Sequence, residues 1–255
     1  MKKTAFMNVL ERICPFSLQY EWDNSGVQIN LGHEDVRNVL VAMEITHDVI
    51  DEAIEGGVDM ILTHHPLLFN PIRTVDIKNI TQQYIIRLVA ADIEVVSCHT
   101  NFDVIKGGNN DYLMELMGVS EASELQDQCG RIGTLSRAVS FEKFVCKLDD
   151  TLGKPGIKFN GELEQQVKTI ACCTGAGSDY IEAAIRTGAD VFVSGDIKHD
   201  KAQMAKEFGM CLIDAGHWGT EQIFVPNMAG KLKAKAKSLK ITMSSVNQNP
   251  FNSII

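Results

Sequence analysis

The sequence predicts an α/β protein built from two similar α/β domains. Short apolar runs of strand length alternate with amphipathic helical segments, a pattern typical of parallel sheets. The segment 48–65 matches the segment 179–196 without a gap, which indicates that the pattern occurs twice. Several expected strands end in histidine or carboxylate side chains. These observations predict the fold class and direct attention to the strand ends.

The first half begins with an amphipathic helix over 3–13, interrupted by polar residues and so unlike a signal peptide. After a turn-rich loop, a strand over 38–43, a helix over 47–55 and a strand over 60–62 form a strand–helix–strand unit. The further elements expected in this half are a helix over 78–91, a strand over 93–98 and a helix over 109–117.

From about 120 to 135 the pattern weakens into a polar connection that contains glycine, and we place the domain boundary there. We expect one domain to comprise residues 1–125 and 226–255, and the other to comprise residues 126–225. The elements expected after the boundary are strands over 133–140, 169–173, 191–193, 211–213 and 241–246, and helices over 141–149, 178–186, 198–208 and 231–240.

The two matched segments share six identities in eighteen positions. Asp48, Ile50, Ala53, Ile54, Gly57 and Asp59 coincide with Asp179, Ile181, Ala184, Ile185, Gly188 and Asp190. Any two such units converge on similar patterns, but these identities favour an internal duplication. In this register His64 and His65 fall on Gly195 and Asp196, so only the first copy carries paired histidines.

Composition restricts the classes of partner. The chain has 255 residues, 24 basic against 33 acidic, and a formal net charge of −9, which argues against nucleic acid or an anionic membrane as the main partner. No apolar run reaches the length of a membrane span. Seven cysteines without a CxxC pair indicate reduced thiols and a cytoplasmic protein.

The pair His64 and His65 follows a buried strand and precedes Pro66, which ends the strand. Neutral imidazole nitrogen is a good ligand for divalent Zn, Fe, Co and Ni. Taken alone, the pair is equally compatible with loop histidines that make ordinary hydrogen bonds. Asp23, in the segment Trp22–Asn30, is first interpreted as part of a structural turn and second as a carboxylate that lines a pocket.

Other strand ends supply the remaining candidates. His99 and Asp103 follow the strand over 93–98, and His217 and Glu221 lie four residues apart after the strand over 211–213. Ligands of open α/β sheets collect beyond the carboxyl ends of the strands. The predicted metal ligands are His64, His65, Asp103, His217 and Glu221. Three nitrogens and two carboxylates exceed the needs of one catalytic zinc and suit two ions.

Five motifs resemble the NIF3-like family in sequence and order: DNSGVQ, THHPLLF, HTNFD, SGDIKH and DAGHWGTE. Members are also called dinuclear-metal-centre hexameric proteins or GTP cyclohydrolase 1 type 2 homologs. The resemblance implies the NIF3-like fold with a metal site in the cleft between its domains, the same five ligands, and a homohexamer. It is to the short form, without an inserted domain. One departure is His199 and Asp200 after Lys198, where many relatives have an aromatic residue and then a histidine.

The expected function is that of a metal-dependent hydrolase. It would use a hydroxide that bridges two divalent ions (Zn, Fe, Mn, Co or Ni) for ring opening of the cyclohydrolase type or for amide or phosphate hydrolysis. The alternative is a non-enzymatic metal-binding, adaptor or regulatory protein. No GxxxxGK[ST] loop is present, and the small-molecule substrate is not specified. His99 and Asp23 are the candidate catalytic residues, and for His99 a role in orienting a ligand is favoured.

Overall fold

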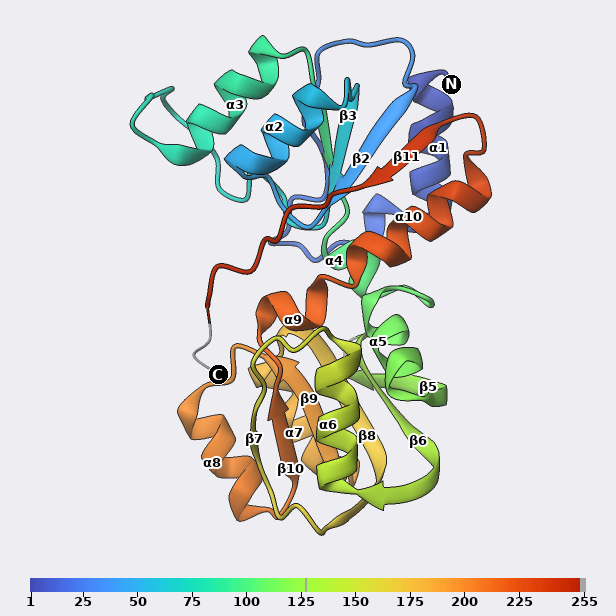
Figure 1. Ribbon diagram of the computed structural model, residues 1–255, viewed down its shortest axis with the longest axis vertical. Coiled ribbons are helices and arrows are strands. Elements are labelled where there is room, and N and C mark those ends of the chain that lie inside the picture. Colours follow the sequence, from blue (N-terminus) through green and yellow to red (C-terminus); the bar gives the residue numbers. More distant parts are fainter. Residues whose placement is uncertain (127, 253–255) are drawn as a thin grey trace. The chain divides into compact units, whose positions relative to one another are not determined.

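The computed structural model describes residues 1–126 and 128–252 and has a mixed α/β fold with two sheets. The chain forms two compact units, each around one sheet (Figure 1). The first unit contains Met1–Phe102 and Phe224–Gln248, and the second contains Asp103–Ile223 and residues 249–252.

The first unit has a five-stranded sheet in the order β1-β4-β3-β2-β11. Strands β2, β3, β4 and β11 are parallel, and β1 pairs with β4 in the antiparallel sense. The strands are β1 (Gly26–Ile29), β2 (Asn38–Ala42), β3 (Met60–Thr63), β4 (Glu94–Ser97) and β11 (Lys240–Met243). The helices are α1 (Lys3–Ile13), α2 (His47–Glu55), α3 (Ile80–Ala90) and α10 (Phe224–Lys235), with a 3-10 turn at Phe16–Leu18.

Helices cover both faces of this sheet, so its central strands are apolar throughout. Figure 1 shows α2 and α3 on one side of the sheet and α1 and α10 on the other. All four residues of β3 are buried, as are all four of β4. The local sequence also sets the start of α2, where the Thr46 side chain accepts a hydrogen bond from the backbone N–H of Val49.

One buried strand residue is charged. The Glu94 side chain is fully buried, and its Oε1 accepts hydrogen bonds from Lys3 Nζ at 2.6 Å and from the backbone N–H groups of Leu31 and Gly32 at 2.8 and 3.0 Å. Burial raises the pKa of this carboxyl, but the bonds from Lys3 and the backbone outweigh burial and hold the pKa below its usual value. The carboxylate therefore ties the N-terminal helix and the loop after β1 to the sheet.

We expect Glu94→Gln to lower the free energy of unfolding at pH 7 by about 2 kcal/mol, because hydrogen bonds to a buried charge would be weakened. The folded-state pKa is lowered, so this stabilisation is complete above the carboxyl's unfolded pKa of about 4.3 and is lost as the pH falls through the folded value. Urea unfolding at pH 7 and at pH 3.5 should show a smaller difference between the two proteins at the lower pH. Glu34→Gln is the control, because this exposed carboxylate pairs only at the surface with Lys2 and should cost less than about 0.5 kcal/mol. The prediction would be contradicted if the loss of unfolding free energy in Glu94→Gln were the same at both pH values.

The second unit has a six-stranded sheet in the order β5-β6-β8-β9-β10-β7. Strands β8, β9 and β10 are parallel, and the outer pairings are antiparallel. The strands are β5 (Val119–Gln126), β6 (Cys129–Ser140), β7 (Lys158–Asn160), β8 (Gln166–Ala176), β9 (Val191–Gly195) and β10 (Cys211–Asp214). The helices are α5 (Asn109–Met117), α6 (Phe141–Thr151), α7 (Ile181–Arg186), α8 (His199–Glu207) and α9 (His217–Glu221), with a 3-10 turn at Ser178–Tyr180. The short helix α4 (Thr100–Asp103) lies where the chain passes from the first unit to the second.

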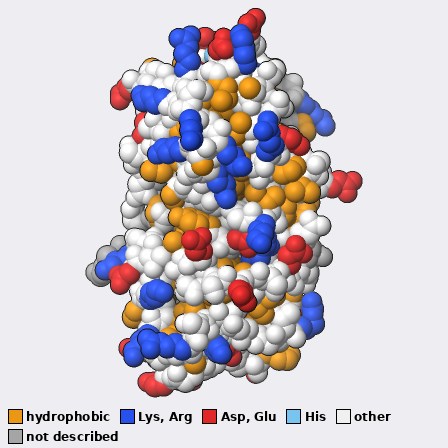
Figure 2. Space-filling view, turned by 90° about the vertical axis from the view of Figure 1, so that its right-hand side faces the viewer, with side chains coloured by type: hydrophobic (Ala, Val, Ile, Leu, Met, Phe, Trp, Pro, Cys, Tyr) orange, Lys and Arg blue, Asp and Glu red, His pale blue; other side chains and the backbone are white. Residues whose placement is uncertain are grey.

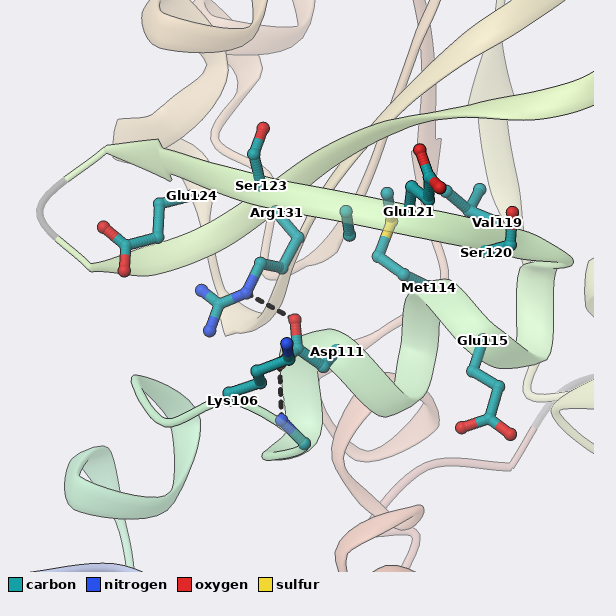
Figure 3. Close-up of a pocket in the computed structure, with 12 residues that line it drawn as sticks. Lys106, Asp111, Met114, Glu115, Val119, Ser120, Glu121, Ser123, Glu124 and Arg131 are labelled. Atoms are coloured by element: carbon teal, nitrogen blue, oxygen red, sulfur yellow. Dashed lines mark hydrogen bonds and ion pairs between the residues drawn. The ribbon is translucent and has the colours of Figure 1, made fainter.

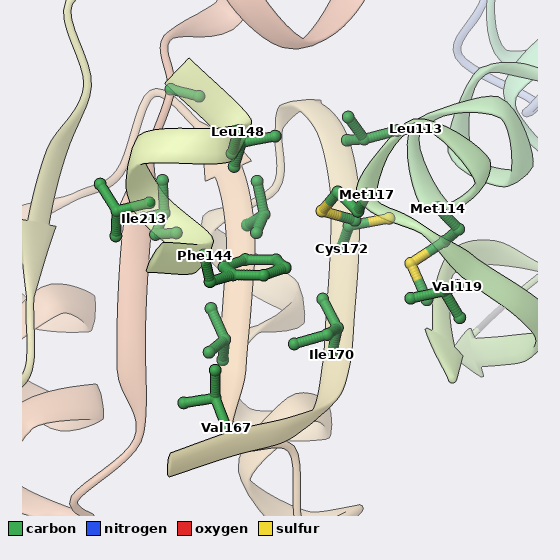
Figure 4. Packing of buried hydrophobic residues seen from close by; sticks show 14 of the residues in the cluster. Leu113, Met114, Met117, Val119, Phe144, Leu148, Val167, Ile170, Cys172 and Ile213 are labelled. Atoms are coloured by element: carbon green, nitrogen blue, oxygen red, sulfur yellow. The ribbon is translucent and has the colours of Figure 1, made fainter. Parts of the chain in front are cut away.

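The core of the second unit lies between its sheet and the helices α5 and α6. Phe144 and Leu148 of α6 belong to the same buried cluster as Ile170 of β8 and Ile213 of β10 (Figure 4). Met117 of α5 extends this cluster toward β5 and β6. The apolar spacing of α6 accounts for this arrangement, since Phe141, Phe144, Val145 and Leu148 are its buried residues.

The structure supports the equivalence of the two matched segments. The Asp59 carboxylate accepts hydrogen bonds from the backbone N–H groups of residues 37 and 38, at 2.7 and 2.8 Å. Asp190 does the same for the N–H groups of residues 168 and 169, at 2.8 and 2.7 Å. In both units the aspartate thus ties the start of one parallel strand to the loop before the next.

Most predicted elements are present, and α1, α2 and α5 have the predicted bounds. The polar connection expected over 120–135 is wrong, because β5 and the first part of β6 occupy it. Strand β5 lies at the sheet edge with most of its side chains exposed, so it lacks the apolar signal of a buried strand. The units divide at Phe102–Asp103 rather than near 125, because α5 packs against β5, β6 and β8.

The structure also shows the state of the cysteines and the character of the helices. All seven cysteines are free thiols, and all except Cys146 are buried. Within residues 1–126 and 128–252, no helix combines the length and the apolar character that crossing a membrane requires.

Candidate metal centre

In the first unit, three histidines follow two neighbouring parallel strands. The backbone N–H groups of His64 and His65 both donate to the Met43 carbonyl, at 3.0 and 2.9 Å, just after β3 ends. His99 follows β4, which pairs with β3. Ring centroids lie 5.3 Å apart for His64 and His65, and 5.1 and 5.6 Å from His99 to these two. The end of this sheet therefore brings the three imidazoles together.

The hydrogen bond of each ring determines which nitrogen can bind a metal. His64 is fully buried, and its Nδ1 donates to the Cys98 carbonyl at 2.9 Å. A carbonyl can only accept, so Nδ1 carries the proton and Nε2 carries the lone pair. His65 Nδ1 lies 3.5 Å from Glu44 Oε2, a carboxylate partner of the kind that supports metal-bound histidine. Ligand atoms of His64, His65 and His99 all lie within 4.8 Å of one another, so the three could hold a metal ion.

Asp23 fixes the third imidazole. Its side chain is fully buried, and Oδ1 lies 2.8 Å from His99 Nδ1. Oδ2 accepts hydrogen bonds from the hydroxyls of Thr100 at 2.5 Å and Ser25 at 2.9 Å. Burial raises the pKa of Asp23, but the bond and the attraction to His99, with the two hydroxyls, hold that pKa well below its usual range. Asp23 thus belongs to the turn that the sequence predicts, and it also lines a hollow with Trp22 and Phe69.

In the second unit, helix α9 presents His217 and Glu221 on one face, as their spacing predicts. His217 Nε2 lies 2.8 Å from Glu221 Oε2, and His217 Nδ1 lies 2.7 Å from Asp196 Oδ2. Glu221 is only 4% exposed. The contact from Asp196 is the carboxylate–histidine arrangement found behind metal ligands, and it leaves Nε2 as the nitrogen suited to a metal.

Asp103 is the second carboxylate of this unit. It is buried, and its Oδ1 accepts a hydrogen bond from Asn109 Nδ2 at 3.0 Å. Asn110 Nδ2 donates to the Asp103 backbone carbonyl at 3.1 Å. Two amides at the start of α5 therefore fix the side chain and the backbone of this residue.

Gly175, at the end of β8, leaves the space that the Glu221 carboxylate occupies. A Cβ atom at Gly175 would overlap Glu221 Oε1 and would lie 3.3 Å from His217 Nε2. The backbone also has φ +68°, which favours glycine. This close approach of backbone to two candidate ligands fits a built site rather than a chance group of surface residues.

We expect Gly175→Ala to displace the Glu221 carboxylate and to reduce bound metal at least tenfold at limiting metal concentration. Gly188→Ala is a matched control, because Gly188 has φ +74° and no heavy atom within 4 Å of its added Cβ. Both variants carry the backbone strain of about 1 kcal/mol, and only Gly175→Ala should lose metal in equilibrium dialysis against Zn²⁺. Equal metal content in the two variants would show that the space beside Glu221 has no such role.

The donor set of each unit fits divalent transition metals. The first unit offers three imidazoles that could hold one ion. The second contains one imidazole and two carboxylates, and nitrogen and oxygen donors of these kinds suit Zn, Fe, Mn, Co or Ni. Three residues that lie against the candidate ligands were not among the predicted site residues: Asp196, Gly175 and Glu44. For Asp196 a signal existed, because it occupies the position of His65 in the second copy of the repeat. The sequence carries no comparable signal for Gly175 or Glu44.

A large hollow in the second unit is lined by other residues. Its volume is about 1110 Å³, and it lies between α5, β5 and β6 (Figure 3). Arg131 is the buried cation there, and it donates to Asp111 and to the carbonyls of Gln128, Gly130, Val104 and Ile105. With these acceptors around its guanidinium, Arg131 supports the structure rather than an anion site.

The surface carries charges of both signs, as expected for a chain without an excess of basic residues. On the face seen in Figure 2, Lys and Arg side chains lie interspersed with Asp, Glu and hydrophobic side chains. This mixture differs from the continuous basic face typical of nucleic-acid-binding proteins.

Comparison with known proteins gives consistent results. The family model described as Duf34/NIF3 (NGG1p interacting factor 3) matches residues 1–250. A Clostridium perfringens protein named "GTP cyclohydrolase 1 type 2 homolog" is 31% identical over 262 aligned positions, covering 100% of both chains. The crystal structure of Staphylococcus aureus protein SA1388 is 28% identical, with a TM-score of 0.92 and coverage of 100% of this chain and 99% of that chain. Reduced HcgD from Methanocaldococcus jannaschii is 30% identical, with a TM-score of 0.83 and coverage of 96% and 98%.

Proposed function

The chain belongs to the Duf34/NIF3 family, and on this basis we propose that it is a metal-dependent hydrolase with a dinuclear centre. The proposed ligands are His64, His65, Asp103, His217 and Glu221. The observation that carries the proposal is the hydrogen bonding of the histidines, because His64 and His217 each have Nδ1 engaged by an acceptor and Nε2 suited to a metal.

Divalent ions at these ligands would supply Lewis-acid activation of water and stabilise developing negative charge. The chain's own acid–base group is His99. Asp23 holds the His99 ring through Nδ1, so that Nε2 can take a proton and later return it. Because Asp23 also accepts two hydroxyl hydrogen bonds, its carboxylate stays ionised while the imidazole changes charge.

The reaction classes that we propose are ring opening of the cyclohydrolase type and hydrolysis of an amide or phosphate ester. Support for the first comes from the names of the related proteins. The donor set itself supports water-dependent bond cleavage and does not select among the three. No GxxxxGK[ST] phosphate loop occurs in the sequence, so a nucleotide would have to be held in another way.

A non-enzymatic role in metal binding or regulation is the second candidate. The complete burial of His64 favours it, because structural and storage sites are closed and fully ligated by protein. The partial exposure of His65 and His217, whose side chains are 23% and 35% exposed, favours the hydrolase. Catalytic sites keep one position open to water.

We also propose that the protein assembles as a homohexamer in the cytoplasm and acts on a small molecule. The hexamer is supported by the resemblance to the family, and the location by seven thiols that form no disulfide. Light scattering of the purified protein tests the assembly, and a monomer at micromolar concentration would contradict it.

Elemental analysis tests the proposed centre, using protein purified without chelator or nickel affinity resin. We expect about two metal equivalents per chain. The loaded protein is then assayed against cyclic amides, linear amides and phosphate esters, with the chelated protein as control. Two equivalents with metal-dependent turnover support the hydrolase, and two equivalents without turnover support the second candidate. A metal content near zero, not restored by reloading, would overturn both.

A further inference from the structure

We propose that the hollow between Trp22–Asn24 and Leu68–Ile72 binds an uncharged, planar heteroaromatic ring, such as a nucleobase, by stacking on Trp22. The hollow belongs to the first unit and has a volume of about 450 Å³. That volume lies within the range of small-molecule sites. The inference names a substrate class for the proposed hydrolase and rests on that function for its meaning, although the binding itself can be tested without metal.

The hollow is lined by large apolar side chains that are held at the surface. Trp22 is 59% exposed, Phe69 48% and Ile72 43%. Single exposed apolar residues are ordinary, but three that line one hollow form a patch of the kind that marks ligand sites.

Hydrogen bonds tie the two walls together. Asn24 Nδ2 donates to the Leu68 carbonyl at 2.6 Å, and the Leu68 N–H donates to Gln28 Oε1 at 3.0 Å. Gln28, which is buried, returns a bond from Nε2 to the Asn24 carbonyl at 2.7 Å. The aromatic rings therefore project from a fixed frame, so little conformational entropy would be lost when a ligand binds.

The geometry of the rings selects a flat ligand. The centroids of Trp22 and Phe69 lie 6.0 Å apart, and their planes meet at 58°. Two rings at this angle form an open corner, in which a third ring stacks on one face and meets the other edge to face. A bulky saturated group would not match both surfaces.

The polar groups favour a heteroaromatic ring without charge. Asn24 and Asn70 line the hollow and bring amide groups to it, whereas no Lys or Arg is among its lining residues in the described chain. The carboxylate of Asp23 is committed to His99, Thr100 and Ser25. Ring nitrogens and exocyclic groups would pair with the amides, and any phosphate would have to lie outside the hollow.

The hollow lies beside the proposed acid–base group. The His99 ring centroid is 6.1 Å from that of Trp22 and 6.3 Å from that of Phe69. A ring stacked on Trp22 would thus lie next to the imidazole cluster, within the same unit. This placement links the hollow to the chemistry of the centre.

Isothermal titration calorimetry tests the inference, with adenosine and guanosine as probes and ribose as the control that lacks the ring. The chelated protein should bind at least one nucleoside saturably and should not bind ribose. Trp22→Ala should weaken nucleoside binding about fivefold or more, because the loss of one stacked aromatic costs at least that. Trp22→Phe should retain more of the binding than Trp22→Ala. Phe208→Ala removes an aromatic side chain that is 69% exposed in the second unit, and this control should bind like the wild type.

The result is separable from that of the proposed function. Nucleoside binding that depends on Trp22, in a protein that takes up no metal, would support the proposed ring-binding site and contradict the proposed hydrolase. Two metal equivalents without saturable nucleoside binding, or nucleoside binding unchanged in both Trp22→Ala and Phe69→Ala, would contradict the proposed ring-binding site and leave the proposed metal centre supported. Thermal melting of the variants excludes unfolding as the cause, since both side chains are exposed and their removal should leave the Tm nearly unchanged.

Discussion

His64→Ala and Glu221→Ala are each expected to remove most of the bound metal, from about two equivalents per chain to less than one half. Each variant deletes a buried donor for which its surroundings provide a fixed position: the Cys98 carbonyl behind His64, and the space at Gly175 beside Glu221. A metal ion held by few ligands loses much of its affinity for the protein when one ligand is removed. An ion bound by two residues would therefore be lost when either of them is replaced. Elemental analysis after dialysis is the measurement.

His33→Ala is the control for the histidine substitution. His33 Nε2 pairs with the exposed carboxylate of Asp92 at 2.9 Å, in the same unit but apart from the imidazole cluster. This variant should keep the metal content of the wild type. If His64→Ala and Glu221→Ala keep two equivalents as well, the five proposed ligands do not form the centre.

Arg131→Leu is expected to lower the free energy of unfolding by about 3–5 kcal/mol, the largest effect on stability that we predict. Arg131 is 4% exposed, and its Nε donates to Asp111 Oδ1 at 2.5 Å. The Nη groups donate to backbone carbonyls on both sides, including Val104 at 3.0 Å and Gly130 at 2.8 Å. Leucine would leave these carbonyls, and the Asp111 carboxylate, whose side chain is only 20% exposed, without their donor.

The measurement is urea unfolding followed by circular dichroism. Arg137→Leu serves as the control, because Arg137 lies on the same strand and is exposed, and it should change stability by no more than about 0.5 kcal/mol. Arg131→Lys keeps the charge but not the planar set of five donors, so it should recover only part of the loss. Similar stabilities for the Arg131 and Arg137 variants would show that the network contributes little.

The sequence alone predicts the elements in which apolar residues recur with a clear helical or strand period. Helix α2 has a Thr46 cap and a buried face of Val49, Ile50 and Ala53, and its bounds were predicted correctly. Strand β5 was missed because an edge strand need not bury its side chains, and β7, only three residues long, gives almost no pattern. Periodicity reports burial, so elements that are held mainly by backbone pairing escape it.

The same reasoning separates the residues of the candidate centre. His64, His65, His217 and Glu221 could be selected because a strand end or a four-residue spacing places them. Asp196 could be singled out only through its equivalence to His65 in the repeat, and Gly175 could not be selected at all. Both make contacts between segments far apart in the chain: 21 residues separate Asp196 from His217, and more than forty separate Gly175 from Glu221. Such contacts are fixed by the packing of the fold and leave no local pattern.

The repeated aspartate hydrogen bonds separate a constant part of each matched segment from a variable part at the end of the following strand. Asp59 and Asp190 accept hydrogen bonds from equivalent backbone positions, so this part of the matched segment is the same in both copies. The two residues at the end of the following strand have diverged, to two histidines in one copy and to glycine and aspartate in the other. Asp196 orients an imidazole where its counterpart, His65, is one. In the proposed centre the first copy supplies two ligands, and the second orients the imidazole of His217. The second copy could not carry a pair of histidines in the same place, because a Cβ at Gly195 would lie 2.4 Å from the backbone of Gly216 and His217.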